Sequence, residues 1–280
     1  MISFLKALLR QLVNTLTNYI AFVLRLLLPP QVLDKILFRP LLIRNNSNKI
    51  LFSILDFGPI IRYRYKTFWT KEPETLDWIN HFPQNSLLID VGANIGLYSL
   101  YAASKGHTVL AFEPQCHNYS LLNSNIILNN FQDKILAFPV CIHSESKLST
   151  LHLTDADFGS AHNSFHRQLD QYGNQLGVTI PQGSISISLN SLLNQYANRT
   201  IFLKIDVDGN EDFVIQGAER LLSSNSLKGI LVELDLTRPD YSYIFNTIVD
   251  AGFNLDPKFS HYIQNPLPSI TTYNHIFNKA

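Results

Sequence analysis

"LLIDVGANIGLYSLYAASKG" (residues 87–106) runs from an apolar segment through an acidic residue and a glycine-rich turn into a helical pattern. The glycines that begin and end the turn, Gly92 and Gly96, allow positive φ angles and let a ligand approach the backbone. Asn94, between them, is one of the few residue types with a side chain that tolerate the left-handed region. The layout predicts a nucleotide-binding turn between a strand and a helix.

Strand-like and helix-like segments alternate along most of the chain after this point. Regular alternation predicts a mostly parallel sheet with helices on both faces. In such sheets ligands bind beyond the carboxyl ends of the strands, near the point where the strand order reverses. The expected strands are 86–91, 108–114, 134–142, 200–208, 228–235 and 273–280, and the expected helices are 95–106, 117–130, 190–197, 211–224 and 240–251.

Breaks in this alternation divide the chain into regions. Short strands are expected at residues 49–57 and 60–69, and a helix at residues 71–82 has acids in its first turn, where the helix dipole favours them. The hairpin-like segments of residues 144–188 are interpreted as an insertion that carries substrate loops. The expected divisions are 1–30 as an amphipathic helical extension, 31–70 as a connecting region and 71–280 as the main domain.

The first 30 residues carry apolar side chains at helical spacing around a narrow polar stripe. Lys6, Arg10 and Arg25 interrupt the apolar run, which argues against a membrane-spanning helix. The helix packs on the main domain or on a second subunit, or it lies on a membrane surface whose anionic headgroups suit these cations. We therefore expect a cytoplasmic protein with peripheral contact to the inner face of the membrane, or a homo-oligomer, through residues 1–28.

The composition is that of a globular protein without a charge surplus. Hydrophobic residues make up 46% of the 280 residues, enough to bury a large core. Basic and acidic residues number 22 each, so there is no basic surplus for a nucleic-acid partner, and none is expected. Cys116 and Cys141 are the only cysteines and provide neither a disulfide framework nor a zinc-binding spacing, which fits a reducing compartment.

The glycine-rich turn does not have the dinucleotide-binding pattern. That fingerprint has glycines at the first, third and sixth positions, but counting from Gly92 the third is Asn94 and the sixth is Leu97. The carboxylate of Asp90 would repel a pyrophosphate, whereas it favours the ammonium and sulfonium groups of S-adenosylmethionine. Glu113, at the end of the second strand, can accept hydrogen bonds from both ribose hydroxyls. An acid at a strand end caps a helix at least as often as it binds a ligand, so the features count only together.

The predicted cofactor is therefore S-adenosylmethionine. Asn118, Asn125 and Asn129 follow the second strand at helical spacing, where they hold the cofactor or form the polar face of the helix. The candidate cofactor-binding residues are Asp90, Gly92, Ala93, Asn94, Gly96, Glu113 and Asn118.

Four separated segments resemble the FkbM family of S-adenosylmethionine-dependent methyltransferases. The segments are IDVGANIGLYSLYAA, AFEP with NYSLLNSNIILNN, FLKIDVDGNEDFVIQGAERLL and ILVELD, and the similarity runs from about residue 60 to the end. The resemblance implies a Rossmann-like, doubly wound sheet of seven mostly parallel strands with an antiparallel C-terminal strand. It also implies O-methylation, typically of a sugar or polyketide hydroxyl. Asn190 is a departure, because family members usually carry aspartate there.

Methyl transfer from a sulfonium is an in-line displacement that needs alignment of donor and acceptor. It can also need a base for the hydroxyl proton. Lys204, Asp206 and Asp208 would share one face of their strand near the carboxyl edge of the sheet. In the alternative interpretation the two carboxylates cap the following helix and pair with Lys204. Glu211 is expected to stabilise the first turn of that helix.

His162 is a candidate base within the insertion, because histidine titrates near neutral pH. Its alternative is a surface hydrogen-bonding group, and His143, near the expected adenine position, is a weaker candidate. Glu233 ends the fifth strand and could bind Mg²⁺ or Ca²⁺ with Asp206 and Asp208, although no spacing rule supports a metal and none is expected. The candidate catalytic residues are Asp206, Asp208, His162 and Lys204.

The favoured function is an S-adenosylmethionine-dependent O-methyltransferase that acts on a hydroxyl of a sugar, glycan or glycolipid. One alternative is a nicotinamide-dependent oxidoreductase, against which the glycine spacing and Asp90 both count. The other is a non-catalytic adaptor with a methyltransferase fold, recruited to a membrane or a partner by its N-terminal helix.

Overall fold

A computed structural model describes the chain at residues 40–170, 172–259 and 270–279, together with Leu16, Tyr19, Ile20 and Val23. The chain divides into two compact units, residues 1–41 and residues 42–280. The amphipathic helix predicted over residues 1–30 lies outside the described residues, apart from the four named ones, which are helical. None of the described helices has the length and hydropathy to cross a bilayer.

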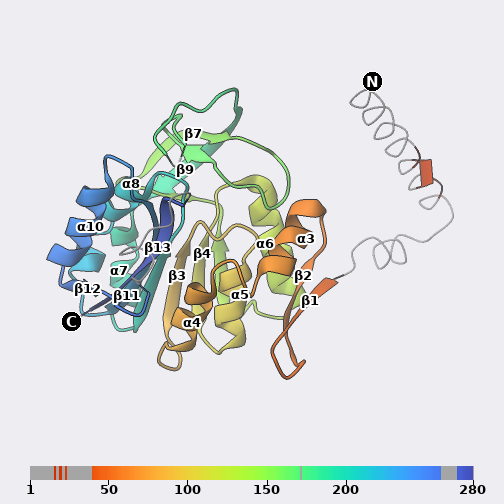
Figure 1. Ribbon diagram of the computed structural model, residues 1–280, viewed down its shortest axis with the longest axis horizontal. Helices are drawn as coiled ribbons and strands as arrows, with labels where there is room; N and C mark the ends of the chain where they lie inside the picture. Colours follow the sequence, from red (N-terminus) through yellow and green to blue (C-terminus); the bar gives the residue numbers. More distant parts are fainter. Residues whose placement is uncertain are drawn as a thin grey trace. The chain divides into compact units, whose positions relative to one another are not determined.

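A seven-stranded sheet forms the centre of the second unit, in the order β12-β13-β11-β10-β3-β4-β5 (Figure 1). β13 runs antiparallel to both of its neighbours, while β3, β4, β5, β10 and β11 pair in parallel. The predicted doubly wound, mostly parallel sheet with an antiparallel C-terminal strand is confirmed. The strands are β3 (Leu87–Val91), β4 (Thr108–Phe112), β5 (Ile135–Phe138), β10 (Ile201–Ile205), β11 (Leu227–Asp235), β12 (Phe253–Leu255) and β13 (Thr272–Lys279).

Helices cover both faces of this sheet. On one face, buried side chains such as Ile89 and Leu203 pack against the helices that follow β10 and β11. On the other face, Ser99 of the helix after β3 donates a hydrogen bond to Asp90 of β3. The helices are α4 (Pro73–Asn80), α5 (Leu97–Ser104), α6 (Cys116–Leu128), α7 (Leu193–Tyr196), α8 (Glu211–Gln216), α9 (Glu219–Leu222) and α10 (Tyr241–Asp250), with a 3₁₀ turn η1 (Leu189–Ser191).

The segment before α4 differs from the expectation. β1 (Pro40–Arg44) and β2 (Ile50–Leu55) form the expected short strands, but the strand predicted at residues 60–69 is wrong, because α3 (Pro59–Thr67) occupies most of it. Pro59 fits the first turn of a helix, where its missing N–H costs nothing. Ile61 and Phe68, two turns apart, are both buried, so helical spacing rather than strand alternation puts apolar side chains in the core.

The insertion contributes three strands to a second sheet of four, in the order β6-β9-β7-β8, at the top of the view in Figure 1. β6 is the end of the strand predicted at residues 134–142, which the structure divides into β5 and β6 around Pro139. A proline cannot donate to a sheet ladder, so the two parts belong to different sheets. The strands are β6 (Cys141–Ile142), β7 (Lys147–Leu153), β8 (Ser164–Phe165) and β9 (Ile180–Ile187).

The helix predicted at residues 211–224 is likewise divided, into α8 and α9. Gly217 lies at the division, and a Cβ atom there would come within 2.2 Å of the backbone oxygen of His143. The close approach of the two backbones therefore requires glycine and explains the break.

Candidate active site

The turn between β3 and α5 lies against the carboxyl end of β10. Gly92 has a φ of 84°, and a Cβ atom on it would come within 1.8 Å of the backbone oxygen of Asp206. Gly96 and Asn94 also have positive φ angles, as the sequence predicted for this turn. Glycine at position 92 thus allows the predicted cofactor turn and the predicted catalytic strand to touch.

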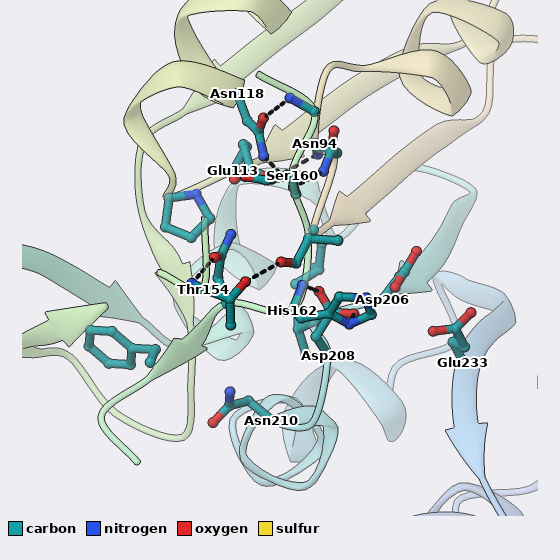
Figure 2. Close-up of a pocket in the computed structure, with 18 of the residues that line it drawn as sticks. Asn94, Glu113, Asn118, Thr154, Ser160, His162, Asp206, Asp208, Asn210 and Glu233 are labelled. Atoms are coloured by element: carbon teal, nitrogen blue, oxygen red, sulfur yellow. Dashed lines mark hydrogen bonds and ion pairs between the residues drawn. The ribbon is translucent and has the colours of Figure 1, made fainter. Parts of the chain in front are cut away.

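A cavity of about 780 Å³ opens at the carboxyl ends of β3, β4, β10 and β11. This is the place expected for an open α/β sheet, because the strand order reverses between β3 and β10. Its volume lies within the range of about 300–1,000 Å³ that is typical of small-molecule sites. Figure 2 shows Asn94, Glu113 and Asn118 on one side of it and Asp206, Asp208 and Glu233 on another.

Glu113 is the acidic residue on the first side of the cavity. Its carboxylate accepts hydrogen bonds from the backbone N–H groups of Asn94 (2.8 Å) and Gln115 (2.9 Å), which hold it at the end of β4. Burial raises the pKa of Glu113 to about 7, although the two N–H groups oppose this shift. The residue is only 5% exposed, but it lines the cavity, and its predicted role as a ribose-binding carboxylate stays a prediction.

Asn94 and Asn118 hold the segment that crosses the cavity, residues 154–163, which we call the strap. Both side-chain amides donate to the backbone oxygen of Ser160, over 2.8 and 3.0 Å. Asn118 also accepts from the backbone N–H of Gly159 at 2.7 Å. Both residues line the cavity, and their side-chain hydrogen bonds join the cofactor turn and α6 to the strap.

Asp90 lies beneath the turn rather than in the cavity wall. It is 1% exposed and is not one of the residues that line the cavity. One carboxylate oxygen accepts from Ser99 Oγ at 2.6 Å, and the other has no hydrogen-bond partner among the described residues. Burial raises the pKa of Asp90 overall, although neighbouring Lys204 and the hydrogen bond from Ser99 act to lower it. Asp90 would therefore act on a bound cofactor through the electric field of its carboxylate and not by direct contact. Its predicted role stays a prediction.

Lys204 is also buried, 1% exposed, and its ammonium lies 3.1 Å from an oxygen of Asp206. Burial lowers the pKa of Lys204, but the carboxylates of Asp206 and Asp90 outweigh this effect and raise it overall. For Asp206, burial raises the pKa, and the attraction of Lys204 and Lys71 more than reverses this. The arrangement keeps Asp206 ionised at the edge of the cavity and gives Lys204 no place in its wall.

A recess of about 50 Å³ adjoins the cavity at the turn. The main cavity and the recess share Arg64, Lys71, Gly92, Asn94 and Asp206. Ala93 and Lys204 line only the recess, while Gly96 lines neither space. Residues before α4 complete the recess and were not predicted: they are Arg64, Thr67, Phe68, Lys71 and Glu72. The sequence shows that Lys71 and Glu72 carry opposite charges, but it does not show that they lie close to the turn.

Asp206, Asp208 and Glu233 form a carboxylate cluster, with oxygen atoms within 4.8 Å of one another. Burial raises the pKa of Glu233 well above its ordinary value, and repulsion by Asp206 adds to the shift. Three carboxylates at this spacing can attract a cationic group or, as the sequence suggested, hold a divalent ion. The metal interpretation stays a hypothesis.

His162 lies on the strap and meets Asp208. Its backbone N–H donates to one oxygen of Asp208 at 2.6 Å, and its Nδ1 lies 3.5 Å from the other. His143, by contrast, is buried against Phe213, with 4.2 Å between ring centroids, and lies outside the cavity lining. Burial lowers the pKa of His143 to about 4. The structure therefore brings His162, and not His143, to the predicted catalytic residues.

Two further predicted residues have structural partners. Glu211 accepts from the backbone N–H of Gly209 at 3.0 Å and lies 3.4 Å from Arg238, in keeping with a role at the start of α8. Asn190 accepts from the backbone N–H of Arg220 at 2.9 Å, at the start of α9. Neither lines the cavity, so the replacement of aspartate at position 190 lies away from the site.

Comparisons with known proteins agree with this geometry. The family model described as "Methyltransferase FkbM domain" matches residues 90–255. The chain belongs to the FkbM methyltransferase family. It is a methyltransferase, and its cofactor is S-adenosylmethionine.

Two curated relatives of this FkbM-family protein are also called methyltransferases. "Methyltransferase 1" of Beauveria bassiana (strain ARSEF 2860) is 25% identical over 196 residues, which cover 61% of this chain and 74% of that protein. "Methyltransferase sdnD" of Sordaria araneosa is 38% identical over 78 residues, which cover 27% of this chain and 29% of that protein.

The FkbM-family chain also has distant likenesses among solved structures. Aeropyrum pernix fibrillarin in complex with natively bound S-adenosyl-L-methionine has a TM-score of 0.42 and 8% identity, over 86% of this chain and 83% of that one. Precorrin-6y C5,15-methyltransferase from Geobacter metallireducens has a TM-score of 0.41 and 10% identity, over 74% and 88% of the two chains. Likenesses at this level carry no argument about the acceptor.

Proposed function

We propose that the protein transfers the methyl group of S-adenosylmethionine to a hydroxyl oxygen of a small sugar or glycan, free or lipid-linked. One observation carries the proposal: a single cavity contains the Glu113 carboxylate on one side and the carboxylate cluster with His162 on the other. The first side suits the ribose of the cofactor, and the second suits an acceptor that must lose a proton.

The described residues fit the cofactor. Glu113 would accept from the ribose hydroxyls, as carboxylates at this position do in nucleotide-binding α/β folds. The recess has both signs of charge, with Lys71 and Arg64 on one hand and Glu72 and Asp206 on the other, which suits an amino-acid end with one carboxylate and one ammonium. When bound, S-adenosylmethionine supplies a methyl group on a positively charged sulfur, which makes the thioether a good leaving group.

The acceptor side combines polar and apolar surfaces. Phe165 and Tyr172 line the cavity and can pack on a sugar face, whereas Phe158 packs against Phe57 instead. Asp155 and the carboxylate cluster would repel a phosphate backbone, which supports a neutral acceptor over a nucleic acid. The chemistry favours a hydroxyl acceptor because a carboxylate or imidazole can remove its proton.

The test is calorimetric titration with S-adenosylhomocysteine and with NAD, followed by transfer of radiolabelled methyl groups to a panel of glycosides. We expect micromolar binding of S-adenosylhomocysteine, no binding of NAD, and alkali-stable methyl ether products. Glu113→Ala should weaken S-adenosylhomocysteine binding at least about tenfold, because two charge-assisted hydrogen bonds are lost. Glu145→Ala is the control, since its side chain is 68% exposed and lies outside the cavity lining. Binding of NAD alone, or methylation of nitrogen acceptors only, would contradict the proposal.

A further inference from the structure

Two residues in left-handed backbone conformations meet in the cavity. His162 has a φ of 63° and Asp208 a φ of 52°. This conformation is unfavourable for residues with side chains, and it persists at sites where the surroundings impose it. Figure 2 shows the two side chains together, with the His162 backbone N–H donating to the Asp208 carboxylate.

We propose that His162 is the base that takes the proton of the acceptor hydroxyl and that Asp208 positions its ring. This inference rests on the proposed function. Nδ1 of His162 lies 3.5 Å from an oxygen of Asp208, so this carboxylate would favour the tautomer with its proton on Nδ1, which leaves Nε2 to accept the proton of the hydroxyl. Both residues line the cavity that holds Glu113, so the base and the cofactor share one space.

The strap fixes His162 relative to the cofactor turn. Thr154 Oγ1 donates to the backbone oxygen of Ala161 at 2.9 Å, which ties together the two ends of the strap. Asn94 of the turn and Asn118 of α6 both donate to the backbone oxygen of Ser160, two residues before His162. The base is thus placed by the same side chains that border the predicted cofactor site, which is how alignment of donor and acceptor is achieved.

The proposed step balances in atoms and charge. The acceptor oxygen attacks the methyl carbon, the carbon–sulfur bond breaks, and its electron pair stays on sulfur. The hydroxyl proton passes to Nε2 of His162. One positive charge disappears from the sulfur and one appears on the imidazole, next to the carboxylate cluster, whose oxygens lie within 4.8 Å of one another. The carboxylate cluster includes Asp208 beside the His162 ring, so its fixed negative charge would stabilise the imidazolium that forms without reorganisation.

His162→Asn and Asp208→Asn test the pair, because asparagine tolerates the left-handed conformation and keeps the backbone. The matched control is His166→Asn: His166 is an exposed histidine with a φ of 71° that does not line the cavity. With a glycoside that the wild type methylates, we expect kcat to fall about 10²–10⁴-fold in His162→Asn. The dissociation constant of S-adenosylhomocysteine should change by less than about twofold, and the control should match the wild type.

Two further measurements separate a base from a structural residue. Imidazole in the buffer should restore part of kcat to His162→Gly but not to Asp208→Asn. Both asparagine variants should lose less activity with a phenolic acceptor than with an aliphatic alcohol, because a more acidic hydroxyl needs less help from a base. Equal losses with all acceptors together with no imidazole rescue would overturn the proposal. A wild type that binds S-adenosylhomocysteine but methylates no hydroxyl would instead overturn the proposed function and this step with it.

Discussion

Glu233 lies at a position where a negative charge is unfavourable. Burial and the nearby carboxylate of Asp206 raise its pKa well above the ordinary value of 4.5. The folded state therefore binds more protons than the unfolded state above pH 4.5, and the stability from this group is lost as the pH rises toward the folded pKa. The carboxylate cluster thus lowers stability in the range where a methyltransferase is expected to work.

We predict that Glu233→Gln stabilises the protein at neutral and higher pH, because the amide keeps the shape without the repulsion. The gain should be about 1 kcal/mol or more at pH 8, which corresponds to about 2–4 °C in melting temperature for a domain of this size. It should shrink as the pH falls and vanish about one unit below pH 4.5, where the wild-type carboxyl is neutral in both states. Thermal melts from about pH 3.5 to pH 8 measure it, with the exposed Glu145→Gln as control. A constant difference at all pH values would contradict the explanation.

The positions of individual residues could be predicted from the sequence where they depend only on the path of the main chain. Gly92, Glu113 and Asp208 follow the ends of parallel strands, so their positions at one edge of the sheet follow from the alternation of strands and helices. Side-chain direction was less predictable. Asp90 and Lys204 pair in register on adjacent strands, and both are buried beneath the site instead of lining the cavity. The sequence shows that both residues are charged, but it does not show that helix α5 covers the face of the sheet on which they lie.

At the scale of elements, the errors have a common cause. The strand predicted at residues 60–69 forms α3, because its alternating pattern also satisfies a helix with Ile61 and Phe68 buried. The division of residues 211–224 depends on the backbone of His143 near Gly217, a contact between distant parts of the chain. Local periodicity cannot show either effect, because tertiary packing decides between two patterns that the sequence allows.

Helix α3, which was predicted as a strand, contributes directly to the cavity through Arg64. Its guanidinium donates two hydrogen bonds to the backbone oxygen of Gly159 on the strap, at 2.9 and 2.7 Å. We predict that Arg64→Ala loosens the strap, raising hydrogen exchange of residues 154–163 about tenfold, as expected for the loss of roughly 1.5 kcal/mol. S-adenosylhomocysteine binding should weaken as well, since Arg64 also lines the recess.

Arg62→Ala is the matched control on the same helix, because Arg62 is 59% exposed and pairs with Asp56 away from the strap. Hydrogen-exchange mass spectrometry of the two variants shows whether the faster exchange is confined to the strap or occurs throughout the protein. Equal protection of the strap in Arg64→Ala and the wild type would show that the asparagine contacts to Ser160 suffice.

For the whole molecule, the compact unit of residues 42–280 contains every described residue that lines the cavity and the recess. Segments on both sides of the family match at residues 90–255 take part, with Arg64 and Lys71 before it and Thr272 after it. The site therefore depends on packing between segments about 200 residues apart in the chain. The sequence predicts where the strands end, but it does not predict which segments outside residues 90–255 cover those ends.

This organisation leads to a prediction for the N-terminal extension. Deletion of residues 1–30 removes none of the described residues that line the cavity, so S-adenosylhomocysteine affinity and the rate with a soluble glycoside should stay within about twofold of the full chain. If the extension lies on a membrane surface, as Lys6, Arg10 and Arg25 suggest, the same deletion should abolish sedimentation with vesicles that contain anionic lipid. Binding to such vesicles should also fall with rising salt, because screening weakens the attraction of these cations to headgroups. A truncated chain that still sediments would place the membrane contact on residues 31–280, and one that loses cofactor affinity would show that the extension supports the catalytic unit.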